Sequence, residues 1–184
     1  MDRPLWPKAI ARRFAYFAFR RRLRAGSLKW MICMGTDLVK TPKIDEKYAC
    51  FKLDIRRSKI HRYGVFAGEA IPAHRKVIEY TGQRLNRKQA KIRGDGDYTY
   101  LFALDTYWTL DGAVGGSGAE IINHSCDPNL ISRIVKGHVL YMSLRTIRRG
   151  EELTVDYNFD KDVRTFPCSC GSPSCAGAIG KTKT

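Results

Sequence analysis

The chain has 184 residues, of which 43% are hydrophobic and 11% aromatic. This length suits one domain with a substantial core, and this composition excludes a chain that is disordered throughout. No apolar run approaches the ~20 residues that span a bilayer, so we expect no transmembrane segment. The net charge of +15 favours an acidic partner, such as nucleic acid or an anionic lipid surface.

The positive charge is concentrated in the first 44 residues, which hold 11 of the 33 Lys and Arg residues but only two acids. Within residues 1–30, the spacing of aromatic and arginine side chains permits a basic amphipathic helix. Such a helix would bind nucleic acid, an anionic surface or a partner protein. A disordered tail, a targeting remnant and a translation start assigned too early are the alternatives, since Met31 and Met34 follow.

Residues 35–48 look like a linker, because they are polar and turn-prone around Thr41-Pro42-Lys43. We therefore divide the chain into a basic extension with its linker (1–48), a central domain (49–160) and a C-terminal tail (161–184). From residue 51 onward, short apolar stretches alternate with turns, which is typical of β-strands. The predicted strands cover residues 51–55, 64–67, 77–80, 98–104, 107–110, 130–135, 138–143 and 153–155.

Two local signals add to this pattern. Lys136-Gly137 would close a hairpin between the strands on either side. Asn86 would cap a short polar helix over residues 87–93. The sequence has no regular alternation of strands and helices and no Gly-rich loop before a helix, which argues against a Rossmann dinucleotide site. The predicted fold class is therefore mainly β with short helices.

Residues 121–129 (IINHSCDPN) place an amide, an imidazole, a hydroxyl and a thiol behind two apolar residues. An Asp-Pro-Asn turn then ends the segment abruptly. A ligand or metal site and a polar loop that caps backbone groups are equally compatible with this segment alone.

Three cysteines near the C-terminus, Cys168, Cys170 and Cys175, follow the pattern C-x-C-x4-C in a segment bent by Gly and Pro. Thiolates this close together are natural zinc ligands, and a closed tetrahedral site needs a fourth ligand. Cys126 is our candidate because it lies in the polar segment 121–129. Redox-active or incidental cysteines are the alternative.

Cysteine usage also bears on the compartment. Six cysteines are few for a secreted scaffold, and basic residues interrupt every apolar stretch near the N-terminus, so we predict no signal peptide. We expect an intracellular protein, nuclear in a eukaryote and cytoplasmic in a bacterium, in which clustered cysteines bind metal rather than form disulfides. Cys33 and Cys50 are predicted to be ordinary buried thiols.

The ordered motifs resemble SET-domain protein lysine methyltransferases that carry a post-SET zinc motif and lack a pre-SET region. The motifs are HRYGVFA (61–67), IEYTG (78–82), INHSCDPN (122–129), GEELTVDY (150–157) and CSCGSPSC (168–175). One motif alone would be weak, but all of them in this order are specific. The resemblance implies a β-clip fold of small curved sheets whose C-terminal part forms a pseudoknot, an exception to the rule that chains do not thread.

The resemblance further implies an enzyme that transfers methyl groups from S-adenosylmethionine to a lysine side chain of a protein, such as a histone or another basic protein. It implies Tyr157 and Tyr100 as catalytic residues. The implied cofactor-binding positions are His61, Arg62, Tyr63, Gly64, Tyr100, Asn123, His124 and Ser169. The implied lysine channel contains Phe102, Val155 and Phe159, and the implied ligands of Zn²⁺ are Cys126, Cys168, Cys170 and Cys175.

Three positions depart from the family pattern. Arg62 occupies the first position of a loop that usually reads Gly-x-Gly, so its side chain either demands another backbone turn or approaches the carboxylate of the cofactor. Glu120 stands where the family commonly has arginine, which reverses a local charge. Val155 is smaller than the aromatic residue often found there, so the number of methyl groups transferred stays open.

Two other functions are compatible with the sequence. A catalytically silent SET module would bind a lysine-bearing partner without methylating it, although the joint presence of Tyr157, Tyr100, Asn123 and His124 argues against this. Alternatively, residues 1–30 carry the main function, with nucleic acid or a membrane as the ligand. We expect the protein to be a monomer.

Overall fold

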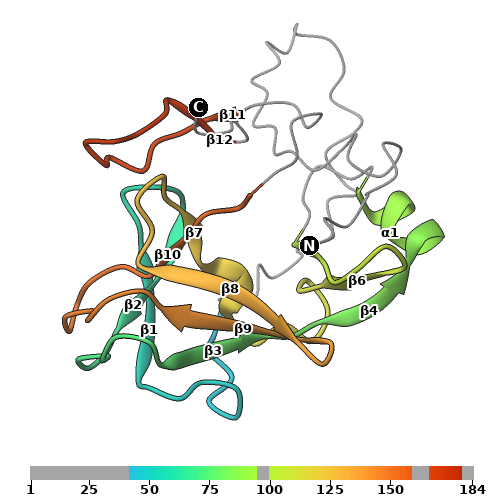
Figure 1. The fold of residues 1–184 in the computed structure, drawn as a ribbon, viewed down its shortest axis with the longest axis horizontal. Coiled ribbons are helices and arrows are strands. Elements are labelled where there is room, and N and C mark those ends of the chain that lie inside the picture. Colours follow the sequence, from blue (N-terminus) through green and yellow to red (C-terminus); the bar gives the residue numbers. More distant parts are fainter. Residues whose placement is uncertain (1–41, 95–99, 159–165, 180–184) are drawn as a thin grey trace, which may run out of the picture.

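The computed structural model describes residues 42–94, 100–158 and 166–179. In these ranges short strands dominate, accompanied by one α-helix and one 3-10 helix (Figure 1). The expectation of a mainly β chain with short helices is confirmed. None of the helices in these ranges is long and apolar enough to cross a membrane. The helix expected within residues 1–30 lies outside the described part of the chain.

An antiparallel hairpin opens the fold, formed by β1 (Leu53–Arg57) and β2 (Tyr63–Ala67). Strand β2 is largely buried, whereas β1 is half-exposed. Strand β1 begins and ends two residues later than the predicted 51–55. The turn accounts for this shift, because the backbone N–H of Ser58 donates to the carbonyl of Arg62 at 3.1 Å and extends the pairing up to that point.

A five-stranded sheet carries most of the core, with the strand order β3-β9-β8-β10-β7. Its strands are β3 (Lys76–Tyr80), β7 (Asn123–His124), β8 (Leu130–Val135), β9 (His138–Ser143) and β10 (Thr154–Val155). The antiparallel pair β8–β9 is the predicted hairpin around residues 136–137.

Strand β10 is inserted between β7 and β8, which are neighbours in sequence. It pairs in parallel with both, so the loop 125–129 crosses β10 to join them. This strand order agrees with the threaded C-terminal part that the family resemblance implied. As a consequence, Tyr157 lies within hydrogen-bond distance of His124, although 33 positions separate them.

A three-stranded sheet with the order β4-β6-β5 forms one end of the domain (Figure 1). It consists of β4 (Gln83–Asn86), β5 (Leu101–Ala103) and β6 (Trp108–Asp111). Strand β4 was not predicted, because only Leu85 of its four residues is buried. The predicted strand 98–104 is shorter in the structure, and residues 98–99 lie outside the described ranges.

Helix α1 (Arg87–Gly94) follows β4 directly and has the predicted cap. The Asn86 side-chain oxygen accepts hydrogen bonds from the backbone N–H groups of Lys88 (3.0 Å) and Gln89 (3.1 Å). The Gln89 side chain accepts from the Asn86 N–H in return, which completes a capping box. An ion pair of 3.2 Å from Arg93 to the buried Asp111 holds the helix on the sheet.

The remaining elements are the 3-10 helix η1 (Ala119–Ile121) and the small sheet of β11 (Phe166–Pro167) and β12 (Ala178–Ile179). Residues 42–48, the described part of the segment 35–48 expected to be a linker, contact the domain. The backbone N–H of Asp45 donates to Ser117 at 2.9 Å, and Ile44 packs against the core.

The core consists of apolar side chains from both larger sheets and their connections. Fully buried members are Val65, Ile71, Val77, Ile78, Ile122, Leu130, Val139, Ile147 and Leu153. The prediction that Cys50 is buried is wrong, since this residue is exposed. Ala49 and Phe51 on either side pack against the core, and alternation along an extended backbone directs Cys50 to the other face. Cys33 lies outside the described residues.

Candidate active site and cysteine cluster

A half-buried carboxylate fixes the loop between β1 and β2. Glu152 Oε1 accepts hydrogen bonds from the Ser58 hydroxyl at 2.7 Å and from Asn123 Nδ2 at 2.9 Å. Asn123 Nδ2 also donates to the carbonyl of Tyr63 at 2.9 Å. Gly64 leaves room for these contacts, because a Cβ there would lie 2.2 Å from Glu152 Oε1. The loop expected to bind the cofactor is thereby anchored to β7 and to the segment before β10.

Arg62 keeps a glycine-like backbone in this loop. Its φ is 38°, within the left-handed region, where a side chain costs about 1–2 kcal/mol. The departure from the Gly-x-Gly pattern therefore leaves a left-handed turn and adds an exposed positive charge. The pKa of the neighbouring His61 is lowered, first by partial burial of the His61 imidazole and then by the positive charge of Arg62.

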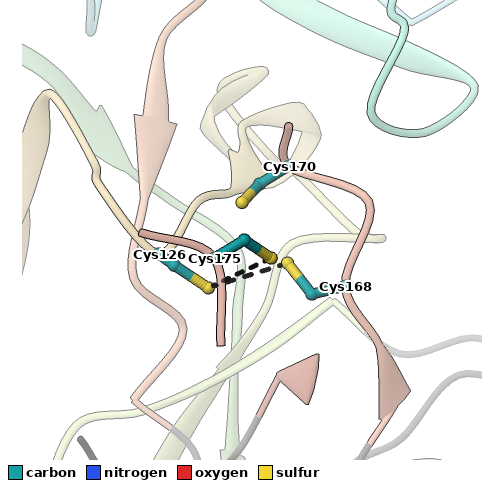
Figure 2. Close-up of side chains that lie close together, drawn as sticks. All are labelled: Cys126, Cys168, Cys170 and Cys175. Carbon is teal, nitrogen blue, oxygen red and sulfur yellow. Dashed lines mark hydrogen bonds between the residues drawn. The ribbon is translucent and has the colours of Figure 1, made fainter. Parts of the chain in front are cut away.

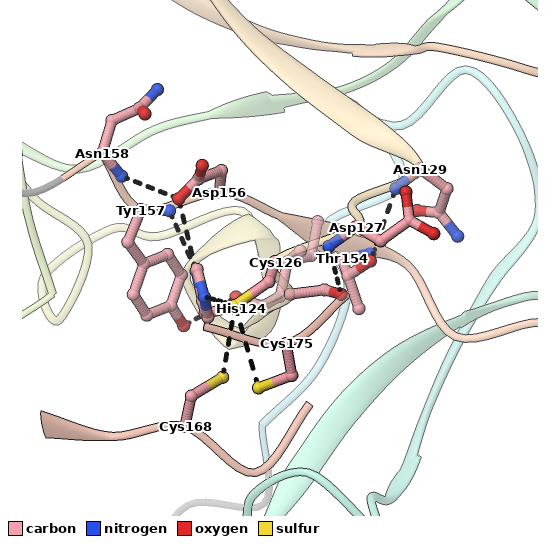
Figure 3. A network of polar contacts seen from close by, with 12 residues as sticks. His124, Cys126, Asp127, Asn129, Thr154, Asp156, Tyr157, Asn158, Cys168 and Cys175 are labelled. Carbon is pink, nitrogen blue, oxygen red and sulfur yellow. Dashed lines mark hydrogen bonds and ion pairs between the residues drawn. The ribbon is translucent and has the colours of Figure 1, made fainter. Parts of the chain in front are cut away.

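Tyr157 follows β10 and is held by hydrogen bonds of both its backbone and its side chain (Figure 3). Its hydroxyl donates to the carbonyl of Ile122 at 3.0 Å, and its backbone N–H donates to Nδ1 of His124 at 3.3 Å. The residue exposes 38% of its surface, but the hydroxyl itself is enclosed. This burial, with the nearby Tyr100, raises the pKa of Tyr157, so the hydroxyl is protonated at neutral pH.

His124 is buried in β7 and touches three groups with its ring nitrogens. Nε2 lies 3.5 Å from the sulfur of Cys126. Nδ1 receives the N–H of Tyr157 and also lies 3.5 Å from Oδ1 of Asp156. The rings of His124 and Tyr157 are tilted at a centroid distance of 5.4 Å. His124 therefore links the cysteine cluster to the candidate catalytic tyrosine.

The other candidate catalytic residue, Tyr100, is half-buried just before β5. Its carbonyl accepts hydrogen bonds from the hydroxyl of Tyr80 and from the N–H of Gly112. The ring of Phe102 lies 5.4 Å from the ring of Tyr80. The tyrosine and the phenylalanine of the predicted site are thus held through one buried residue, Tyr80.

The other predicted channel residues differ in position. Val155 is 3% exposed and pairs with His124 and Leu130 inside the five-stranded sheet. Val155 therefore belongs to the core, and it lies two residues before Tyr157 in the chain. Phe159 lies outside the described residues.

The four predicted zinc ligands come together (Figure 2). The sulfur atoms of Cys126, Cys168, Cys170 and Cys175 all lie within 4.8 Å of one another. The sulfur of Cys126 is 3.8 Å from that of Cys168 and 4.0 Å from that of Cys175. Zn–S bonds of ~2.3 Å in a tetrahedron place the sulfur ligands ~3.8 Å apart, so this donor set fits Zn²⁺. Ser169, predicted to contact the cofactor, is exposed between two of these cysteines.

The pKa values of three cysteines in the cluster shift in different directions. Burial raises the pKa of the Cys126 and Cys168 thiols. Burial acts in the same direction at Cys170, but hydrogen bonds with the backbones of Cys126 and Ser172 outweigh it and lower that pKa to about 6. A bound dication would oppose the effect of burial at Cys126 and Cys168, because a metal ion stabilises the thiolate form of its ligands.

Two residues of this arrangement were missed by sequence reasoning. Glu152 lies within the motif GEELTVDY, but we gave it no role; its position directly before the buried Leu153 is the signal that could have found it. Nothing in the sequence singles out Ser58, because its contact with Glu152 spans 94 positions.

Comparisons with known proteins agree with the motifs. The SET domain family model matches residues 62–158. The chain is 38% identical over 170 residues to "Histone-lysine N-methyltransferase, H3 lysine-4 specific" of Schizosaccharomyces pombe, covering 86% of this chain and 18% of that protein. It is 38% identical over 137 residues to the protein of the same name from Saccharomyces cerevisiae, covering 67% of this chain and 13% of that protein.

It is also 37% identical over 158 residues to human "Histone-lysine N-methyltransferase SETD1A", covering 79% of this chain and 9% of that protein. The chain thus spans less than a fifth of the length of these relatives. Because the family model covers more than half of the chain and the threaded β-fold agrees with it, the chain belongs to the SET-domain family.

Proposed function

We propose that the chain is an S-adenosylmethionine-dependent protein-lysine N-methyltransferase that acts on a histone or another basic protein. The observation that carries this proposal is the threaded strand order, which sets Tyr157 on the carbonyl of Ile122 and beside the ring of His124. The names of the relatives, which are histone-lysine methyltransferases specific for lysine 4 of histone H3 in the two yeasts, support a histone substrate. Such a substrate would place the protein in the nucleus, as a chromatin regulator.

For the cofactor we propose the predicted positions on the loop 61–64, in β7, at Tyr100 and at Ser169. S-adenosylmethionine would supply a methyl group on a positively charged sulfur. Oxygen atoms favour such a charge, and the carbonyl of Ile122 and the hydroxyl of Tyr157 lie together at the site. The exposed cation of Arg62 suits the carboxylate of the same molecule.

The amide of Asn123 and the imidazole of His124 would act on the cofactor by positioning. The Nδ2 group of Asn123 is engaged by Tyr63 and Glu152, and the ring of His124 is engaged by Cys126 and Tyr157. These side chains therefore fix the loop and the backbone of β7, which then present their own carbonyl and N–H groups.

The substrate lysine must lose its proton before it can attack a methyl group. Lysine titrates near ~10.4 in water, and burial in an apolar channel lowers that value. We propose that Tyr100, Phe102, Val155 and Phe159 provide such surroundings. Tyr157 keeps its own proton at neutral pH, so its hydroxyl orients the reacting groups rather than accepting the lysine proton. Alignment of this kind can contribute ~7–11 kcal/mol to lowering the barrier.

We propose that Zn²⁺ binds the four clustered cysteines and fastens the tail 161–184 over the site. Little apolar area holds this tail, since Phe166 is its buried hydrophobic residue among residues 166–179. A structural zinc site would supply the missing stability directly.

Replacement of Tyr157 by Phe tests the proposal. Loss of the hydroxyl should lower kcat at least ~100-fold, as expected for removal of one preorganised polar group, while S-adenosylmethionine still binds. Radiolabelled methyl transfer onto a mixture of basic proteins measures the rate, and isothermal titration measures cofactor binding. Tyr107→Phe is the matched control, because Tyr107 is 68% exposed and takes part in none of the contacts described for the site.

Wild-type transfer rates in Tyr157→Phe would remove Tyr157 from catalysis. A wild-type chain that binds a histone peptide but transfers no methyl group would instead support the silent module.

A further inference from the structure

Glu120 places a carboxylate close to the candidate lysine channel. It lies in η1, three residues before Asn123 of β7. The resembling family commonly has arginine at this position, so the charge at this point of the chain is reversed. The side chain is half-buried, and a side chain of a bound substrate can therefore still reach it.

Glycine residues make room for this carboxylate. A Cβ on Gly116 would lie 2.6 Å from both Cδ and Oε1 of Glu120, and a Cβ on Gly112 would lie 2.9 Å from the Glu120 Cβ. Oε2 accepts the backbone N–H of Gly118 at 2.9 Å, and Gly118 has a φ of 96°, which glycine adopts without strain. The carboxylate thus packs directly against the backbone of segment 112–118.

The segment 112–118 is itself held in place by hydrogen bonds. The hydroxyl of Ser117 donates to the carbonyl of Glu79 at 2.5 Å, and the Ser117 carbonyl accepts the N–H of Asp45 at 2.9 Å. The N–H of Gly112 donates to the carbonyl of Tyr100 at 2.8 Å. The carboxylate therefore has a defined position, which discrimination between similar ligands requires.

Glu120 also adjoins the aromatic residues of the candidate channel. The Cβ that Gly112 lacks would lie 2.7 Å from the hydroxyl of Tyr80, so Tyr80 and Glu120 share one small space beside Gly112. Tyr80 donates its hydroxyl to the carbonyl of Tyr100, and its ring lies 5.4 Å from that of Phe102. A carboxylate thus stands directly beside the residues proposed to surround the target lysine.

In the described part of the chain, this carboxylate has no ion pair. Its hydrogen bonds there come from the backbone N–H groups of Gly118 and of Glu120 itself. Burial raises the pKa of Glu120, and these N–H groups offset only part of that effect. A carboxylate that has lost water without gaining a countercharge favours the binding of a cation.

The target lysine is not the cation that this chemistry favours. Its ammonium must lose a proton before it can attack a methyl group, and a carboxylate beside it would raise its pKa and hold that proton. A second cationic side chain of the substrate involves no such conflict. Arginine fits best, because its guanidinium stays charged and donates two parallel hydrogen bonds to one carboxylate.

We propose that Glu120 is a specificity-determining residue whose carboxylate pairs with an arginine that flanks the target lysine in the substrate. The proposal rests on the proposed function, which supplies the target lysine, and adds a sequence requirement to it. An extended substrate advances about 3.3 Å per residue, so the arginine lies within about three residues of the lysine.

Synthetic peptides with a single lysine test this requirement. The lysine stands in a background of Gly, Ala and Ser, with arginine, glutamine or glutamate at one of the three positions before or after it. Radiolabelled methyl transfer by the full chain gives kcat/KM, and fluorescence anisotropy of the labelled peptides gives Kd. At one or two positions we expect arginine to improve both about 10-fold over glutamine, as for a hydrogen-bonded charge pair.

Two variants assign this preference to the carboxylate. Glu120→Gln keeps the shape of the side chain without its charge, so the preference for arginine should disappear. Glu120→Arg should reverse it and favour glutamate at the same positions. Glu46→Gln is the matched control, because Glu46 is exposed and has no ion pair within the described residues. Thermal denaturation checks folding, and Glu120→Gln alone decides the result if Glu120→Arg does not fold.

Equal values for the arginine and glutamine peptides in the wild-type chain, or a preference that persists in Glu120→Gln, would overturn the proposal. Peptides that are methylated regardless of arginine would leave the proposed function intact and remove only the pairing. If no peptide is methylated but arginine peptides bind more tightly through the charge of Glu120, the proposed function fails and the recognition of arginine remains.

Discussion

Strand β10 and the cysteine tail meet at one site, yet different forces hold them there. Strand β10 consists of two buried residues that lie between two other strands of the core sheet. Strands β11 and β12 are equally short, but they pair only with each other among the described elements, and most of their surroundings are exposed. Equal strand length thus says little about stability. Burial and hydrogen bonds hold the first region, and the second depends on its four sulfur atoms.

Asn129 is the residue that ties β10 into the core. It is 2% exposed, and its Nδ2 donates to the carbonyl of Glu152 at 2.8 Å. Its Oδ1 accepts the backbone N–H of Thr154 at 2.9 Å. The side-chain amide thus makes the hydrogen bonds that the backbone of a neighbouring strand would make, at the point where the loop 125–129 crosses β10. Asn129, which the sequence indicated only as part of a turn, thus acts as a clamp: its side chain holds the threaded strand β10 in place.

Loss of one cysteine should have the largest effect, and only in the tail. Cys175→Ser should remove tight zinc binding, whose free energy at structural sites is about 10–16 kcal/mol. Hydrogen exchange should then lose protection in residues 166–179 but not in β8 and β9. Cys50→Ser is the matched control, because this exposed cysteine lies outside the cluster. Equal loss of protection in the five-stranded sheet would contradict the separation of the two regions.

Loss of the Asn129 side chain should have the opposite distribution. Asn129→Ala leaves a buried N–H of Thr154 and a carbonyl of Glu152 without their partner, which should cost about 2–4 kcal/mol in the free energy of unfolding. Urea denaturation measures this loss, and metal analysis should show unchanged zinc content. Asn86→Ala is the comparison, since it removes only an exposed helix cap and should cost about 1 kcal/mol. Similar losses in the two variants would refute the clamp.

A methyl group at Gly64 should disturb the contact between β2 and the segment before β10. The new Cβ would overlap Glu152 Oε1, so Gly64→Ala should lower the free energy of unfolding by about 1–3 kcal/mol. In the double variant with Glu152→Ala the overlap disappears, and the two effects should therefore not add. Thermal denaturation of the four proteins of this cycle gives the coupling. Strict additivity would show that the loop relaxes without cost.

The sequence predicted these elements unequally, for physical reasons. The hairpin 136–137 and the cap at Asn86 follow from local chemistry, so single residues were enough to predict them. The cysteine cluster followed from the chemistry of thiols, even though Cys126 lies far from the others in sequence. The threading followed from family resemblance alone, because a parallel pair as short as β7–β10 has no periodic pattern of its own.

Other features depend on contacts that no local pattern encodes. Strand β4 is polar and exists through its pairing with β6. The contact of Gly64 with Glu152 arises only when the hairpin and β10 are assembled. The exposure of Cys50 follows from the bridge between Ala49 and Ile78, which requires the edge of the folded sheet.

A partly buried carboxylate on the same sheet, that of Glu79, gives the smallest expected effect and contrasts with Asn129. Glu79 accepts from His138 at 2.7 Å and pairs with Lys76 at 3.1 Å. Burial opposes ionisation, but these partners outweigh it and lower the pKa of Glu79. A lowered folded-state pKa stabilises the fold above the ordinary value, and this contribution is lost as the pH falls through the folded value.

Glu79→Gln should therefore lower the free energy of unfolding at pH 7 by at most about 1 kcal/mol, and the difference from wild type should vanish in acid. Urea denaturation at both pH values measures it. Glu46→Gln is the control, since the structure gives the Glu46 side chain no ion pair within the described residues. A difference that grows in acid would mean that Glu79 is held neutral in the fold. Ionising Glu79 would then cost as much free energy as ionising a fully buried carboxylate, and the contrast with Asn129 would not hold.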